Sequence, residues 1–159
     1  MTDTRDLEDS FWKHLNDDRV VLLGTPSIPP RPMTAIAEDD RAPLWFFTSA
    51  DTDLGKAIDD TTPLQATATF SAKGHDLFAT IAGTLVADKD RATIDRLWNP
   101  FIAAWFEGKD DPKLRLLRMD APDAHVWLNE NSLLAGVKLL LGRDPKDSYQ
   151  DKTGDVDLR

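Results

Sequence analysis

Two neighbouring segments with strand character constrain this fold more than any other feature. Leu64 to Ser71 alternates strictly between apolar and polar side chains, and Leu77 to Ala87 follows after a short polar turn. Alternation with a period of two predicts a strand with one buried face. A short connection favours antiparallel pairing. Gly83, inside the second segment, predicts a bulge or a close approach of another chain segment.

Further strand-like segments come in runs rather than alternating regularly with helices. A proline-rich connector, Pro26 to Pro30, separates the first two of them. Such runs predict a mainly β (α+β) fold, an antiparallel barrel decorated with helices. The additional predicted strands are 19–25, 31–37, 44–48, 114–119 and 125–129.

The predicted helices are short. Leu7, Phe11 and Leu15 form an apolar stripe on the first of them, residues 6–18. Asp51 is the expected N-cap of the second. The expected later helices cover residues 51–58, 88–99, 101–106 and 133–141. We expect one domain over residues 1–142, and a polar, mobile tail over residues 143–159.

The charge balance excludes several classes of partner. The chain has 159 residues, with 19 Lys and Arg against 28 Asp and Glu, for a net charge of −9. Such a chain is unsuited to neutralising nucleic-acid phosphates and is repelled by anionic membranes. Cysteine is absent, which excludes disulfides and thiolate sites. No apolar run approaches the length of a membrane span and no signal peptide is visible, so we expect a cytoplasmic protein with no nucleic-acid or membrane partner.

Most familiar catalytic motifs are missing. The sequence has no dinucleotide-binding glycine motif, no P-loop and no nucleophile elbow. His14, His75 and His125 lie far apart, so no metal site is expected. The many carboxylates identify no acid–base pair, and the catalytic residues stay unassigned.

One group of residues suggests a phosphate site. Arg31 opens a predicted strand, Thr48 and Ser49 end the next one, and Lys56 lies on the following helix. If these element ends converge, they offer a guanidinium, two hydroxyls and an ammonium for a phosphate monoester. Residues of these types at element ends are also common on ordinary surfaces. The five tryptophans likewise fit a core, a dimer interface or a flat conjugated ligand.

These residues also carry a family resemblance. Arg31-Pro-Met-Thr34, Leu44 to Ser49 and Lys56 resemble FMN-binding split-barrel proteins related to pyridoxamine 5′-phosphate oxidase. Later segments resemble the general stress protein 26-like branch of that family. They are Ile81 to Thr84, Asp88 to Asp90, Leu97 to Pro100, Trp105 to Gly108, Asp110 to Pro112 and Val126-Trp127.

The resemblance implies a six-stranded antiparallel split β-barrel with flanking short helices. It also implies a homodimer with two flavin sites at the subunit interface. By position, Arg31 and Lys56 would bind the FMN phosphate, helped by Thr48 and Ser49. The remaining implied cofactor-binding residues are Met33, Thr34, Phe47 and Ser71 in one subunit, and Trp98, Trp105 or Trp127 from the partner.

The implied function is that of an FMN-dependent oxidoreductase of unknown substrate. The alternatives are a non-catalytic flavin-binding stress-response protein that buffers or senses flavin, and a dimeric module that has lost the cofactor. Gly55 stands where the oxidase carries an additional cation, and the oxidase's C-terminal Arg-x-His pattern is absent. Both departures argue against oxidation of pyridoxamine 5′-phosphate. FMN is the expected cofactor, with FAD, deazaflavin or haem as alternatives.

Overall fold

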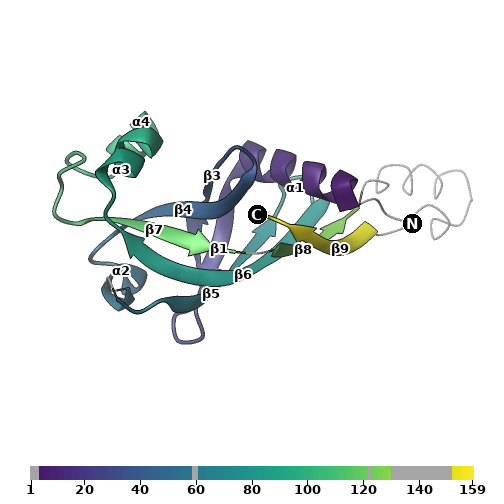
Figure 1. The fold of residues 1–159 in the computed structure, drawn as a ribbon, viewed down its shortest axis with the longest axis horizontal. Helices are drawn as coiled ribbons and strands as arrows, with labels where there is room; N and C mark the ends of the chain where they lie inside the picture. Colours follow the sequence, from purple (N-terminus) through teal and green to yellow (C-terminus); the bar gives the residue numbers. More distant parts are fainter. Residues whose placement is uncertain (1–3, 59–60, 122, 130–151) are drawn as a thin grey trace, which may run out of the picture.

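The computed structural model describes residues 4–58, 61–121, 123–129 and 152–159. These residues build one antiparallel sheet of nine strands that curls into a barrel, with helices at its edges (Figure 1). The strands are β1 (Val20–Gly24), β2 (Arg31–Thr34), β3 (Ile36–Glu38), β4 (Arg41–Ser49), β5 (Leu64–Ser71), β6 (Leu77–Asp88), β7 (Leu114–Asp120), β8 (Asp123–Leu128) and β9 (Lys152–Asp157). The helices are α1 (Thr4–Asp18), α2 (Asp53–Ala57), α3 (Arg91–Leu97) and α4 (Pro100–Ala103).

The predicted mainly β class and its antiparallel split barrel are confirmed. The sheet runs in the order β2-β1-β5-β6-β7-β4-β3, and β8 and β9 extend it from β6. All of these pairings are antiparallel. The strand predicted from alternation, Leu64 to Ser71, has the bounds of β5. The described strands exceed the six expected, partly because the predicted strand 31–37 is divided into β2 and β3.

Gly83 marks the point at which the barrel splits. The first third of β6 pairs with β8, from Leu77 to Thr80, and the last part pairs with β7, from Thr84 to Asp88. A methyl group at Gly83 would lie closer than 3.0 Å to the carbonyl oxygen of Asp120. The expected close approach is therefore confirmed, and glycine lets β6 change partners there.

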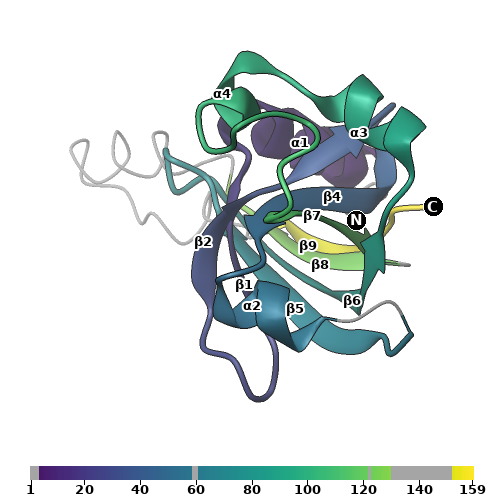
Figure 2. The ribbon, with the colours of Figure 1, turned by 90° about the vertical axis from the view of Figure 1, so that its left-hand side faces the viewer.

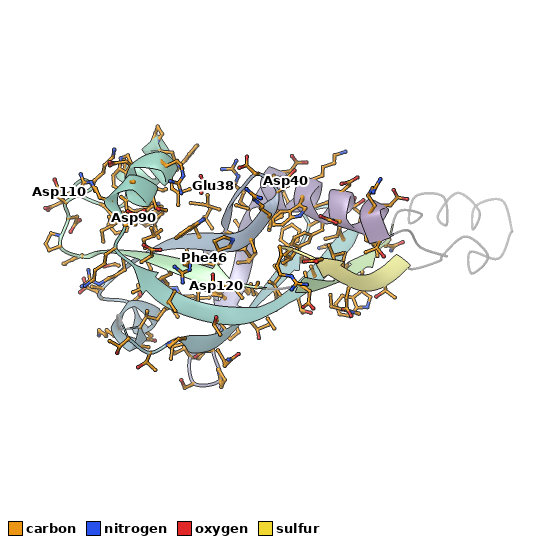
Figure 3. All side chains as sticks on the ribbon, viewed as in Figure 1. Glu38, Asp40, Phe46, Asp90, Asp110 and Asp120 are labelled. Atoms are coloured by element: carbon orange, nitrogen blue, oxygen red, sulfur yellow. The ribbon has the colours of Figure 1, made fainter. Side chains whose placement is uncertain are left out.

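The core lies inside the curled sheet and under α1. The apolar stripe of α1 is buried as predicted, and α1 packs mainly against β9. Phe46, Phe70 and Leu117 contribute fully buried side chains from three strands. Figure 3 shows Phe46 near the middle of the molecule. Burial of side chains of this size contributes roughly 1.5–3 kcal/mol each.

The end of the chain differs from the predicted tail. Lys152 to Asp157 pair with β8 along its whole length, and Val156 and Leu158 are almost completely buried. The segment contains few apolar residues, but alternation along β9 directs Val156 inward beneath α1. The predicted helix 133–141 and the first part of the predicted tail lie outside the described residues.

Helix α3 is tied to the barrel by an ion pair. Arg96 donates to both carboxylate oxygens of Glu38 in β3, at 2.6 and 3.0 Å. This bond lowers the pKa of Glu38, despite an opposing contribution from partial burial. Figure 3 shows Glu38 beside the helical arm that α3 and α4 form. None of the described helices has the length and apolarity to cross a membrane.

Candidate functional site

The ends of three elements meet at one end of the barrel. β4 ends at Ser49 and leads directly into α2, and the two elements are in contact. β3 pairs with β4 through Ile36 and Trp45, and β2 also contacts β4. Because β3 and β4 are antiparallel, residues that precede Ile36 lie toward the Ser49 end of β4. Arg31, five residues before Ile36, therefore lies toward that end. Figures 1 and 2 both show α2 and the loop before β2 at the lower edge of the barrel.

A hydroxyl cluster fixes the corner between β4 and α2. The Thr52 hydroxyl caps α2 by accepting from the Gly55 amide at 3.0 Å, and it donates to the Ser49 carbonyl at 2.9 Å. Its proton is thus committed, so the Thr48 hydroxyl, 2.9 Å away, donates to Thr52. The predicted N-cap, Asp51, is therefore wrong by one residue. Asp51 instead pairs with Lys113 at 3.1 Å.

This arrangement divides the two predicted hydroxyl ligands. Thr48 is 5% exposed and donates within the corner, so its clearest role is to hold α2 in place. Ser49 accepts from the Asp51 amide at 3.3 Å, which leaves its hydroxyl proton available. The sequence analysis did not identify Thr52 as the N-cap. Threonine is a preferred N-cap residue, and Thr52 directly precedes the first residue of α2.

The two predicted phosphate-binding cations are exposed and carry no competing carboxylate. Within the described ranges, the side chains of Arg31 and Lys56 form no ion pair and no hydrogen bond. By contrast, Arg96 and Arg118 each bind carboxylates. Unpaired cations beside a free hydroxyl, in a chain with a net charge of −9, suit a phosphate group.

The other predicted residues of β2 and β4 differ in the direction and exposure of their side chains. Met33 is 9% exposed and points into the core, which leaves its main chain for any ligand. Thr34 is exposed and pairs with Val20. Phe47 lies on the outer face of β4, where its ring meets that of Trp98 edge-on, with the ring centroids 6.2 Å apart. Trp98 thus packs within its own chain.

Ser71 and Trp127 belong to a different face of the sheet. Ser71 lies opposite Phe78, which lies opposite Trp127, and all three side chains are exposed. A shallow hollow of about 400 Å³ adjoins them, lined by Asp18, Val20, Val21, Leu22, Thr69 and Ser71. Trp105 lies elsewhere, just after α4, and is 84% exposed. The elements that carry Arg31 and Lys56 both contact β4, which ends at Ser49, whereas Ser71, Trp127 and Trp105 lie elsewhere.

The histidines make separate pairs. His14 contacts the Ser10 carbonyl at 2.7 Å and Asp76 at 3.0 Å, while His125 contacts Asp155 at 2.7 Å. His75 lies in an exposed turn. Among the described residues, no group of histidine and acidic side chains could hold a metal ion.

Comparison with known proteins identifies the family. The profile described as "Pyridoxamine 5′-phosphate oxidase like" matches residues 6–146, which is most of the chain. The chain belongs to the pyridoxamine 5′-phosphate oxidase-like family. The predicted resemblance is thereby confirmed, including its general stress protein 26-like branch.

Solved structures of this family resemble the chain closely. A general stress family protein from Xanthomonas campestris is 51% identical, with a TM-score of 0.76 over 83% of this chain and 93% of that one. A "general stress FMN/FAD binding protein" from Xanthomonas citri is 50% identical, with a TM-score of 0.74 over 80% and 92%. A general stress protein 26 from Jannaschia sp. CCS1 is 29% identical, with a TM-score of 0.77 over 94% and 98%.

General stress protein 26 of Bacillus subtilis is a more distant member of the family. It is 26% identical to this chain over 88 residues. The match covers 55% of this chain and 63% of that protein, which is less than two thirds of its length.

Proposed function

We propose that this protein binds FMN, with the flavin phosphate held by Arg31, Lys56 and the hydroxyl of Ser49. The observation that carries the proposal is that Arg31 and Lys56, on elements that both contact β4, have exposed side chains without ion pairs among the described residues. A dianionic phosphate there gains charge-assisted hydrogen bonds, each contributing roughly 1.5–3 kcal/mol.

The related protein from Xanthomonas citri supports a flavin, since it is described as binding FMN or FAD. We favour FMN because two cations and one hydroxyl suit a single terminal phosphate. FAD would need a surface for its second phosphate and adenosine. Deazaflavin and haem are further alternatives, and the absorption spectrum and mass of the bound group, described below, distinguish them from FMN.

The ring of the flavin would extend from this corner along β2. There the main chain of Met33 and the exposed side chain of Thr34 could bind its polar edge. Bound flavin supplies one- or two-electron redox chemistry. The contribution of this chain is to hold the phosphate, orient the ring and exclude water from one side of it.

A second copy of the chain would complete the site. Val20, Leu22, Phe78 and Trp127 are each at least 40% exposed, and the strand registers place them on the outer face of β1, β6 and β8. Large apolar side chains on one face are typical of an interface. We propose that this sheet face forms a homodimer contact, with Trp127 or Trp105 closing the partner's flavin site.

Redox turnover is part of the proposal, with an unidentified substrate. The described residues contain no assigned acid or base, so turnover depends on the flavin itself. The test begins with the absorption spectrum of the purified protein and mass spectrometry of any group released on denaturation. Released FMN supports the proposal, whereas a protein that neither contains nor takes up a flavin contradicts it.

The same preparation separates an enzyme from a flavin store or sensor. NADH or NADPH is added anaerobically, and bleaching of the flavin band is followed by a screen of electron acceptors. Reduction with repeated turnover supports an oxidoreductase. Full flavin occupancy without turnover supports the non-catalytic stress-response function.

A further inference from the structure

The barrel end carries one more cation than the sequence analysis identified. Arg115 is the second residue of β7, and the strand register places it directly opposite Thr48 in β4. Directly opposed residues of antiparallel strands point to the same side of the sheet. Phe46 and Leu117, the next pair inward, are both buried in the core, so Thr48 and Arg115 share this inward face.

Arg31 has the same orientation on β2. It is two residues from Met33, whose side chain enters the core, and alternate strand residues share a face. The inward-facing residues at this end of β2, β4 and β7 are thus Arg31, Thr48 and Arg115. Helix α2, which carries Lys56, packs against the same end of β4.

The guanidinium of Arg115 is held without any carboxylate. One of its terminal nitrogens donates to the carbonyl oxygens of Pro112 and Leu114, both at 2.9 Å. Throughout the described portions of the chain it forms no ion pair, although β7 also carries Arg118, which binds Asp88 and Asp120. Carbonyl oxygens orient the group without neutralising its charge, and further N–H donors of the guanidinium remain available.

Helix α2 cannot supply a second cation of its own. A methyl group at Gly55, next to Lys56, would lie far closer than 3.0 Å to the Ser49 carbonyl oxygen. Any longer side chain meets the same main-chain obstacle. Further cations for a dianionic ligand at this corner must therefore come from other elements, and β2 provides Arg31 while β7 provides Arg115.

We propose that Arg115 is a phosphate-recognition residue that makes this site select phosphorylated flavin over riboflavin. The inference rests on the proposed function, because it places the phosphate at the corner between β4 and α2. Arg115 adds a third positive group to Arg31 and Lys56, held in place by the loop that precedes β7. The ligand class recognised is a flavin carrying a terminal phosphate.

The test compares dissociation constants for FMN and riboflavin, measured by flavin fluorescence with the full chain. Riboflavin lacks the phosphate and reports on ring binding alone. Arg115→Gln should weaken FMN binding about ten- to hundredfold and change riboflavin binding less than about twofold. Arg115→Lys, which keeps the charge on a different head group, should lose less FMN affinity.

Arg118→Gln is the matched control, since it changes an arginine on the same strand that faces away from the corner. It should leave the ratio of the two dissociation constants unchanged. An unchanged ratio in Arg115→Gln, or an equal loss of both ligands, overturns the inference. If Arg31→Gln alters the ratio and Arg115→Gln does not, the proposed function stands without Arg115. If the wild type binds neither ligand, both proposals fail.

Discussion

Gly55 packs directly against the main chain of Ser49. A methyl group at Gly55 would lie well within 3.0 Å of the Ser49 carbonyl oxygen, and about 3.1 Å from the Cα atom of Ala50. The same carbonyl accepts the hydroxyl proton of Thr52. The close contact therefore sets how tightly α2 folds back on β4, and with it the position of Lys56.

We expect Gly55→Ala to destabilise the protein by about 1–3 kcal/mol, because backbone atoms cannot yield as a side chain can. FMN binding should weaken as well, since α2 must shift. Urea unfolding and flavin titration measure the two effects. Gly74→Ala is the control, since the atom nearest its added methyl, at 3.2 Å, belongs to the side chain of Asp76 and not to the main chain. Equal stability of the two variants would contradict the account.

Thr48 should matter more for the position of α2 than for direct ligand contact. Thr48→Val keeps the shape but removes the hydrogen bond to Thr52, at a cost of about 1 kcal/mol. Thermal unfolding compares it with Thr69→Val, which changes an exposed threonine on β5. If Thr48→Val is as stable as the wild type, the hydroxyl cluster does not hold the corner.

The His14–Asp76 pair predicts a loss of stability at alkaline pH. Partial burial opposes protonation of His14, but hydrogen bonds to Ser10 and Asp76 outweigh it and raise its pKa above 6.5. Both ring nitrogens face acceptors, so the imidazolium suits the site best. The hydrogen bond from His14 lowers the pKa of Asp76 below 3.8.

The pair therefore stabilises the fold fully between about pH 4 and 6.5, and its contribution disappears as the pH rises through the folded pKa of His14. Because both groups are partly exposed, we expect about 0.5–1 kcal/mol. Urea unfolding at about pH 5.5 and pH 9 should show a larger difference for the wild type than for His14→Gln. His75→Gln, in an exposed turn, should behave like the wild type. Identical pH dependence in all three would contradict the assignment.

Two substitutions distinguish the proposed dimer face from the helical arm as the site of contact between two copies of the chain. Leu22 is 45% exposed on β1, so Leu22→Asp should leave the monomer folded but break the contact between copies. Light scattering after size exclusion should show half the wild-type mass. Phe101→Asp on α4, where the side chain is 84% exposed, should keep the wild-type mass. If Phe101→Asp halves the mass and Leu22→Asp does not, the dimer contact lies on the helical arm and the proposed face is wrong.

Local patterns predicted most of the fold. The alternation of Leu64 to Ser71 is sufficient to define β5, and Gly83 indicated the close approach that divides the barrel. β9 could not be predicted, because its pairing with β8 bridges a long separation in sequence and only Val156 and Leu158 become buried. Long-range pairing of a mostly polar segment leaves little local signal.

The site was predictable by residue type but not by role. Arg31, Ser49 and Lys56 lie at the element ends that the sequence indicated. Thr52 and Arg115 depend on contacts that local sequence does not contain, namely a cap folded onto β4 and a cross-strand position on β7.

The central claim is that Arg31 and Lys56 bind the phosphate of FMN, and an FMN titration of four proteins tests it most directly. Isothermal calorimetry compares the wild type, Arg31→Gln, Lys56→Gln and the control Arg41→Gln, which changes an exposed arginine at the other end of β4. We predict that the first two variants bind FMN at least about tenfold more weakly, while Arg41→Gln matches the wild type. Equal FMN affinity in all four proteins, or none in the wild type, would contradict the account.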